Sequence, residues 1–235
     1  MPNQIHRNRH TSSRRHRAAL PAALALTLLA LTACQATPPT SGGGERSATS
    51  GSTSGSTPGT SATAIAVGKG PQSPYTVQQQ PAPGSCQYRY TADKQPLPDP
   101  KCTPGALNPK VTQENLKTTI CRTGGYTSDI RPPVNITGRE KDLNAKSYSF
   151  KGSLSEAEYD HLISLQLGGD PNDPRNLWVQ PPSPGHDPSK GVNNDKDPVE
   201  SKLAAAVCKG TISLSDAQIA IATDWTTALK KLGLG

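Results

Sequence analysis

Apolar and aromatic residues are scarce in this chain. Of its 235 residues only 32% are hydrophobic and 4% aromatic, with two tryptophans, one phenylalanine and one methionine. No stretch reaches the roughly 20 consecutive apolar residues of a membrane-spanning helix, which excludes a polytopic membrane protein. With 21 glycines and 23 prolines, this composition would form a poor core if it were spread evenly. We therefore expect part of the chain to lie outside the folded unit.

Acidic residues are absent from the N-terminus, where much of the net charge of +7 is concentrated. Five arginines precede residue 18, namely Arg7, Arg9, Arg14, Arg15 and Arg17. From Cys86 onward, 18 lysines and arginines face 17 aspartates and glutamates, a net charge of +1. Neighbouring acidic residues balance Lys190, Lys196 and Lys202. A folded part this close to neutral does not predict strong, salt-sensitive binding to DNA.

Residues 1–33 have the features of an export signal. The basic residues 1–17 are followed by an apolar segment, 18–33, that is too short to span a membrane comfortably. The segment ends in Leu31-Thr32-Ala33-Cys34, which resembles the lipobox of bacterial lipoproteins. In that family the cysteine, here Cys34, carries a diacylglyceryl group and becomes the first mature residue, and two acyl chains give stable anchoring. We expect an exported protein held by lipid on the outer face of the bacterial cell membrane.

Two alternatives to this interpretation stay open. The protein is secreted without an anchor if Cys34 is incidental. The pair Arg14-Arg15 leaves open whether export follows the general or the twin-arginine route.

A long polar segment follows the export signal. Residues 35–85 contain almost nothing but Ser, Thr, Gly, Ala, Pro and Gln. Because so little apolar surface is available there, we expect this segment to be disordered. The chain then has three parts: a signal peptide over 1–33, the lipidated Cys34 with a disordered linker to residue 85, and a folded domain over 86–235.

Four cysteines remain in the folded domain: Cys86, Cys102, Cys121 and Cys208. In an exported chain an even number of cysteines predicts disulfides. No two of them form a Cys-x-x-Cys pair, so we do not expect a structural zinc site. Of the three possible connectivities we favour Cys86–Cys102 with Cys121–Cys208, because the second bond ties the two ends of a small domain together.

Hydrophobic and turn patterns predict short helices first and two strands after them. The helices are expected over 112–120 and 137–146. Alternating apolar residues predict a strand over 159–167, which Gly168-Gly169 ends, and a second strand over 176–180.

Two helices are expected after the strands. The first covers 195–208 with Pro198 in its first turn, where a missing N–H does no harm. The second covers 213–232 and begins with Ser213 and Asp216 as a capping pair. One face of this helix carries an apolar residue every fourth position, namely Ala217, Ile221, Trp225 and Leu229.

The residues around the first strand carry a family resemblance. The segment begins with Tyr159-Asp160-His161, reaches Gly168-Gly169, and continues through Asn176-Leu177-Trp178 to the helix start at Asn193-Asn194. It is similar to the HNH family of endonucleases, whose fold is the ββα-metal or His-Me finger. The resemblance covers roughly 45 of the 235 residues, and the flanking segments are similar to a group of small exported bacterial proteins. It implies an α+β domain, mostly helical, around a ββα core at about 159–208.

The resemblance also implies the chemistry of the site. His161 would be the general base, Asn176 would orient it, and Asp160 with Asn194 (or Asn193) would bind one divalent metal ion. Phosphodiester hydrolysis needs an activated water and stabilisation of charge on the phosphate. Mg²⁺ prefers oxygen ligands and needs only one or two from the protein, so we expect Mg²⁺, with Mn²⁺ or another divalent ion as the alternative. The ordinary pKa of histidine, near 6.5, suits a general base.

Two points of this site remain open in the sequence. Neighbouring residues on a regular strand point to opposite faces, so we expect a bulge or a strand end at Asp160-His161. The second metal ligand is open among Asn193, Asn194 and His186. Asp197 and Glu200 are expected to be charges that favour the helix dipole, with Glu200 also a candidate for supporting the ligands.

The function that these residues predict is metal-dependent hydrolysis of nucleic-acid phosphodiesters, with DNA favoured over RNA, by a monomeric, lipid-anchored domain. The alternative is a non-catalytic binding module of the cell envelope on the same scaffold.

Overall fold

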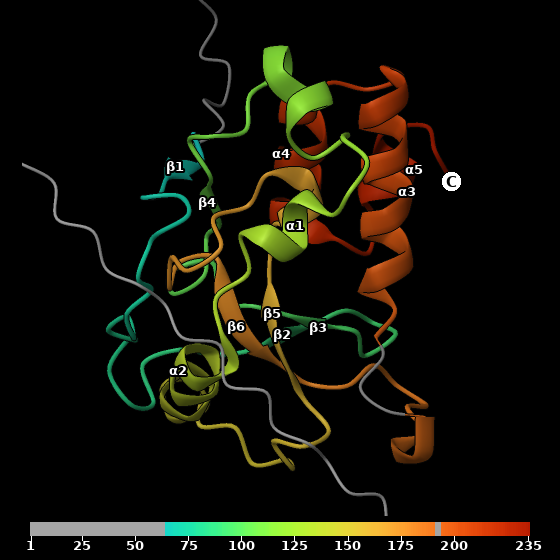
Figure 1. Cartoon of the computed structure of the whole chain (residues 1–235). Coiled ribbons are helices and arrows are strands. Elements are labelled where there is room, and N and C mark those ends of the chain that lie inside the picture. The colour runs from blue at the N-terminus through green and yellow to red at the C-terminus, as the bar shows by residue number, and fades with distance from the viewer. Residues whose placement is uncertain (1–63, 191–193) are drawn as a thin grey trace, which may run out of the picture. The chain divides into compact units, whose positions relative to one another are not determined.

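The chain is seen in a computed structural model that describes residues 64–190 and 194–235 (Figure 1). Short strands and short helices alternate with long loops. The strands are β1 (Ala66–Val67), β2 (Arg89–Tyr90), β3 (Pro96–Leu97), β4 (Ala106–Leu107), β5 (Glu158–His161) and β6 (Leu177–Gln180). The helices are η1 (Gln113–Thr118), α1 (Tyr126–Asp129), α2 (Val134–Ser147), η2 (Leu165–Leu167), η3 (Pro188–Lys190), α3 (Lys196–Lys209), α4 (Leu214–Asp224) and α5 (Ala228–Lys231), where η denotes a 3₁₀ helix.

The strands form three two-stranded sheets in the described part of the chain. Strands β5 and β6 are antiparallel, with Glu158 opposite Gln180 and His161 opposite Leu177. Strands β2 and β3 are also antiparallel, whereas β1 and β4 are parallel. In Figure 1 helix α2 lies on one side of the β5–β6 pair, and α3, α4 and α5 lie together on the other. The mixture of helices and small sheets confirms the expected α+β class.

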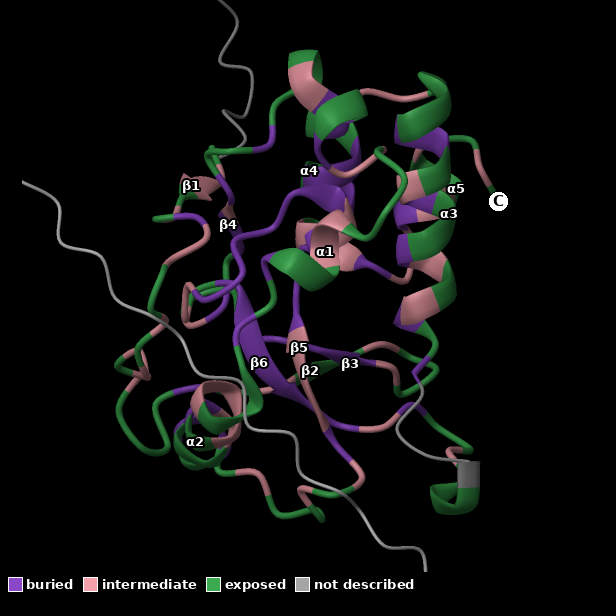
Figure 2. Ribbon diagram, in the orientation of Figure 1, coloured by how far each residue is buried: buried purple, intermediate pink, exposed green. Residues whose placement is uncertain are grey.

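The larger hydrophobic core lies among α3, α4, α5 and η2. Its fully buried members include Leu167, Leu203 and Ile221. The apolar face expected on the last helical segment is confirmed: Ala217, Ile221 and Trp225 are buried, and Leu229, which is partly buried, packs against the same core. Figure 2 shows the buried sides of α3 and α4 and a β6 strand that is buried along its whole length. This core holds α3 beside the loop that follows β5.

The strand expected over 159–167 is shorter than the sequence indicated. Strand β5 ends at His161, and residues 165–167 form η2 instead. The side chain of Asn176 accepts a hydrogen bond from the N–H of Ile163 and donates one to its C=O, both at 3.0 Å. The Asn176 side chain thus binds the N–H and C=O of Ile163, which would pair with a neighbouring strand if β5 continued.

The helix expected over 213–232 is broken in two. Helix α4 ends at Asp224 and α5 begins at Ala228. At the break, Asp224 Oδ1 accepts hydrogen bonds from the backbone N–H of Thr226 at 3.0 Å and from its hydroxyl at 2.6 Å. Such local side-chain bonds compete with a helix. The capping pair at the other end is confirmed, since Ser213 Oγ accepts the N–H of Asp216 at 3.0 Å.

Residues 64–85, which composition assigned to the linker, pack against the domain. Strand β1 pairs with β4, and the N–H of Gly70 donates to Asp170 Oδ2 at 2.6 Å. Further along, the N–H of Gln78 donates to Glu140 Oε1 at 2.7 Å. The folded unit therefore begins well before the expected boundary at residue 86, because backbone hydrogen bonds hold a segment that has few apolar side chains. The expected signal peptide, Cys34 and the part of the expected linker before residue 64 lie outside the described residues.

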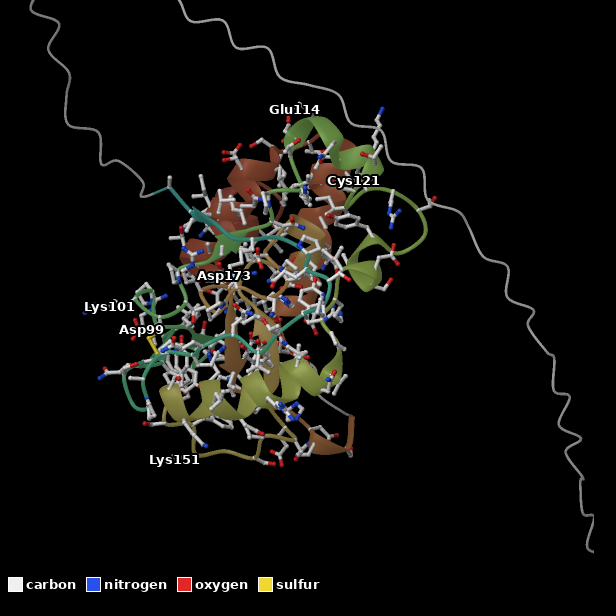
Figure 3. All side chains as sticks on the ribbon, turned by 60° about the vertical axis from the view of Figure 1, so that its left-hand side comes forward. Asp99, Lys101, Glu114, Cys121, Lys151 and Asp173 are labelled. Atoms are coloured by element: carbon white, nitrogen blue, oxygen red, sulfur yellow. A yellow bond between two sulfur atoms is a disulfide. The ribbon has the colours of Figure 1, made fainter. Side chains whose placement is uncertain are left out.

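The favoured disulfide connectivity is confirmed. Cys86 is bonded to Cys102 and Cys121 to Cys208, with Cα–Cα distances of 5.9 and 5.5 Å. Figure 3 labels Cys121 near η1, and Asp99 and Lys101 near the first bond. Two disulfides indicate an oxidising compartment. Among the described helices, none is long and apolar enough to cross a membrane.

The two disulfides differ in the loop they close, and this predicts a difference in stability. Cys121–Cys208 spans 87 residues and Cys86–Cys102 spans 16. In the chain-entropy account, replacing the longer-range pair by serines costs between about 4 and 5 kcal/mol and replacing the other about 3 kcal/mol. Urea denaturation of the two double variants measures both values. Equal losses, or a larger loss for the Cys86–Cys102 pair, would contradict the chain-entropy account. Alkylation of any of the four cysteines in the unreduced protein would contradict the two disulfide bonds.

Candidate functional site

A cavity of about 320 Å³ lies between the end of β5 and the first turns of α3. Most of the residues that line it are polar or charged, and they come from β5, from the loop after it, from α3 and from the segment before α2. They are Arg131, Ala157, Glu158, Tyr159, Asp160, His161, Ser164, Leu165, Asp197 and Glu200. Two of the predicted site residues, Asp160 and His161, therefore line one cavity.

The end of β5 allows both neighbours to reach this cavity. Asp160 still pairs with Trp178 across the sheet, and His161, opposite Leu177, is the last residue of the strand. The strand end that the sequence analysis expected at this pair is confirmed. Only one oxygen of Asp160, Oδ2, forms a hydrogen bond within the described chain, so Oδ1 is available to a ligand.

The ring of His161 is buried and has a defined tautomer. Its Nε2 lies 3.0 Å from the carbonyl oxygen of Pro171. A carbonyl only accepts hydrogen bonds, so Nε2 carries the proton and Nδ1 carries the free lone pair. Burial lowers the pKa of His161 to about 4, which keeps the ring neutral at pH 7. An uncharged imidazole with one nitrogen fixed and the other free is the form that a general base needs.

Lys196, at the start of α3, is completely buried beneath the cavity. Its Nζ donates to Asp160 Oδ2 and to the carbonyl oxygen of His161, both at 2.7 Å, and it also forms an ion pair with Glu200. Burial by itself would lower the pKa of Lys196, but the carboxylates of Asp160 and Glu200 outweigh it and raise that pKa. In the sequence this lysine is one of three basic residues that neighbouring acidic residues balance. Only its position under β5 identifies it as part of the site.

The cavity wall carries more carboxylates than Lys196 neutralises. Burial, together with Asp160 and Asp197, raises the pKa of Glu158 to about 8. Burial also raises the pKa values of Asp197 and Glu200, and Asp160 adds to both shifts. The cavity is lined by three acidic side chains besides Asp160, namely Glu158, Asp197 and Glu200. None of the three was expected from the sequence to be the base or a metal ligand.

Asn194 lies next to this cavity but does not line it. Its Nδ2 donates to Glu158, and its Oδ1 accepts the backbone N–H of Lys196 at 2.8 Å. Both ends of the amide are therefore engaged at the start of α3. Asn193, the other expected ligand, lies outside the described residues. His186 lies in the loop after β6 and is not among the residues that line the cavity.

Asn176 is fully buried and holds the loop after β5 in place. Besides its two bonds to Ile163, its Nδ2 donates to the C=O of Asp170 at 3.0 Å. The side chain makes no hydrogen bond to the ring of His161, so it acts through the loop that carries Pro171. Gly169 makes this arrangement possible, because a Cβ there would lie 1.7 Å from the carbonyl oxygen of Ile163 and 2.7 Å from Asn176 Nδ2.

The side chains of the cavity supply the kind of atoms that a hard divalent cation binds. Carboxylate oxygens are the ligands that Mg²⁺ prefers. Within residues 64–190 and 194–235, Asp160 Oδ1 forms no hydrogen bond, and the carboxylate of Asp197, which contacts the backbone of Asn194, also lines the cavity. The hydroxyl of Ser164, also on the wall, is buried without a partner. Within those ranges no group of three or more acidic, His or Cys side chains converges into a ready-made metal site. The carboxylate oxygens of Asp160 and Asp197 are of the kind that bind an ion with one or two protein ligands and a shell completed by water and substrate.

The bonds of Asn176 predict that its removal destabilises the domain. Asn176→Ala leaves the N–H and C=O of Ile163 unpaired, at a cost of about 1–3 kcal/mol for each buried group. Asn135, on the exposed side of α2, is the matched control, and Asn135→Ala should change stability by less than about 0.5 kcal/mol. Urea denaturation measures both. Equal stabilities for the two variants would mean that these bonds do not hold the loop.

Comparison of the whole chain with family models, with curated proteins and with solved structures gives no match.

Proposed function

We propose that the domain hydrolyses phosphodiester bonds of nucleic acid with the help of one divalent cation, on a ββα core formed by β5, β6 and α3. The order of these elements agrees with the HNH resemblance of the sequence. The observation that carries the proposal is the state of His161, which is neutral, held through Nε2 and placed beside Asp160 in one cavity.

His161 acts as the general base in this proposal. Its Nδ1 accepts a proton from the attacking water, and the carbonyl oxygen of Pro171, 3.0 Å from Nε2, keeps the ring in place. The same carbonyl stabilises the imidazolium that forms, because a hydrogen bond from a charged donor is stronger than one from a neutral donor. Asn176 and Gly169 fix the loop that presents this carbonyl, so their part in the reaction is positioning.

Asp160 provides the first oxygen ligand for the cation, most directly through Oδ1. The second comes from the start of α3, where Asp197 lines the cavity and Asn194 is engaged with Glu158 and the helix backbone. A bound Mg²⁺ or Mn²⁺ would supply Lewis-acid stabilisation of the charge on the phosphate and on the leaving oxygen. Lys196 holds the carboxylate of Asp160 in position from below through an ion pair.

The substrate side of the proposal is a nucleic acid, with DNA favoured over RNA, cleaved by a monomer with little sequence preference. The folded part has nearly equal numbers of basic and acidic residues. Affinity should accordingly depend on a few local contacts rather than on a basic surface.

A non-catalytic binding module is the second candidate, and one observation favours it. The ammonium of Lys196 already pairs with both Asp160 and Glu200 from within the protein, so the site has a cation of its own. In that case the β5–β6–α3 unit would serve as a scaffold, and the domain would leave a plasmid intact with every metal tested.

The proposed location is the outer face of the cell membrane, where a lipid on Cys34 anchors the chain. The disulfides support an oxidising environment, and the lipobox-like sequence supports the anchor. Wild-type protein should partition into detergent, whereas Cys34→Ala should remain as precursor or enter the aqueous phase. Recovery of unmodified wild-type protein from the culture fluid, cleaved at another site, would contradict the anchor.

Plasmid nicking tests the proposed activity and its base. The wild-type domain should nick supercoiled plasmid in Mg²⁺ or Mn²⁺ and stop in EDTA. His161→Ala should lower the rate by about 10²- to 10⁴-fold, the usual contribution of a general base. His161→Gln should be equally slow, since its amide can still donate to Pro171 but cannot act as a base at neutral pH.

His186→Ala is the matched control, because His186 does not line the cavity, and it should cleave at the wild-type rate. Asp160→Asn, which keeps the shape of the side chain, should weaken metal binding and cleavage together, with partial recovery at higher metal concentration. Wild-type cleavage rates in both folded His161 variants would remove His161 from the mechanism.

A further inference from the structure

Arg131 stands apart from the other charged residues of the cavity. It lines the cavity mouth and is exposed, and its positive charge contributes to the lowered pKa of His161. Yet it forms no hydrogen bond or ion pair with any residue that the structure describes. A guanidinium near several carboxylates that pairs with none of them is available to an anion from outside.

The backbone that carries Arg131 is held firmly. The hydroxyl of Tyr75 donates to the carbonyl oxygen of Ile130 at 2.6 Å, and Ile130 is buried. On the other side, Pro132 is buried and Pro133 caps the start of α2. Two consecutive prolines have fixed φ angles. The position of Arg131 at the mouth is thus set by its neighbours and does not depend on a partner for its own side chain.

The charges of the cavity explain why such a residue would be needed. Four acidic side chains line the wall, and Lys196, which pairs with two of them, is buried below and engaged. Apart from Arg131, the residues that line the cavity therefore offer an approaching phosphodiester no positive charge. Arginine suits phosphate binding better than lysine, because its planar guanidinium donates two parallel hydrogen bonds to one phosphate.

We infer that Arg131 binds the phosphate of the substrate at the cavity mouth and positions it toward Nδ1 of His161. This inference rests on the proposed function and adds to it the group that recognises the phosphodiester. Arg131 is then a binding and positioning residue, and the metal ligands and the base perform the chemistry.

Binding without metal separates this role from catalysis. The probe is a fluorescein-labelled DNA oligonucleotide with phosphorothioate linkages, titrated with the exported domain in EDTA and followed by fluorescence anisotropy. Loss of a charge-assisted bidentate contact should raise the Kd of Arg131→Ala about 10- to 100-fold. Arg131→Lys should fall between this variant and the wild type. In Arg131→Ala the slope of log Kd against log salt concentration should be smaller by about 0.7 to 0.9, the change expected when one phosphate contact is lost.

Arg139→Ala is the matched control, because Arg139 is an exposed arginine of α2 that does not line the cavity. It should bind and cleave as the wild type does. In the plasmid assay with Mg²⁺, Arg131→Ala should show its defect mainly as a raised KM, whereas His161→Gln should show a lowered kcat.

The outcomes distinguish this inference from the proposed function. If the wild type cleaves and Arg131→Ala has unchanged Kd and KM, Arg131 has no role in binding and the proposed activity stands. If the wild type binds the oligonucleotide through Arg131 but never cleaves DNA, the phosphate contact stands and the domain is a binding module. If the wild type neither binds nor cleaves, both are overturned.

Discussion

The buried ammonium of Lys196 is the interaction on which the site depends. It connects strand β5, through Asp160 and the carbonyl oxygen of His161, with helix α3, through Glu200. Burying a charge is costly unless its partners compensate, and here three oxygens do so. Without the ammonium, two carboxylates would face each other across the junction of β5 and α3. The same contact that docks the helix therefore allows acidic side chains to gather at the cavity.

Around the β5–β6 pair, side chains form the hydrogen bonds that further strands would otherwise provide. Strand β6 has β5 on one side, and on the other Asn144 of α2 accepts the N–H of Val179 at 2.8 Å. Asn176 does the same for the loop after β5, and Asp170 Oδ1 accepts the N–H groups of Asn172 and Asp173, both at 2.9 Å. Two-stranded sheets are marginal by themselves. Buried amides and carboxylates at the edges make up for strands that are absent.

Local patterns were sufficient for much of the fold. The strand expected over 176–180, the helix expected over 195–208 and the Ser-Asp cap correspond to β6, α3 and the start of α4. Of the three possible disulfide connectivities, the favoured one is present. Asp160 and His161 were also found to line one cavity. Lys196 was not identified, because its burial depends on the packing of β5 over the start of α3. Arg131 was not identified, because only the fold brings the segment before α2 to the cavity. Residues 64–85 were wrongly assigned to the linker for a related reason. Their backbone N–H groups donate to Asp170 and Glu140, and amino-acid composition does not predict such bonds.

The attachment of this N-terminal segment determines where a mechanical load would enter the domain. A pull on residue 64 acts first on the pairing of β1 with β4 and then on the bond from Gly70 to Asp170. Asp170 precedes Pro171, whose carbonyl holds the ring of His161. Tension along the chain is thus transmitted to the edge of the cavity within a few bonds, whereas the helices of the C-terminal core, which begin after residue 194, lie off this path.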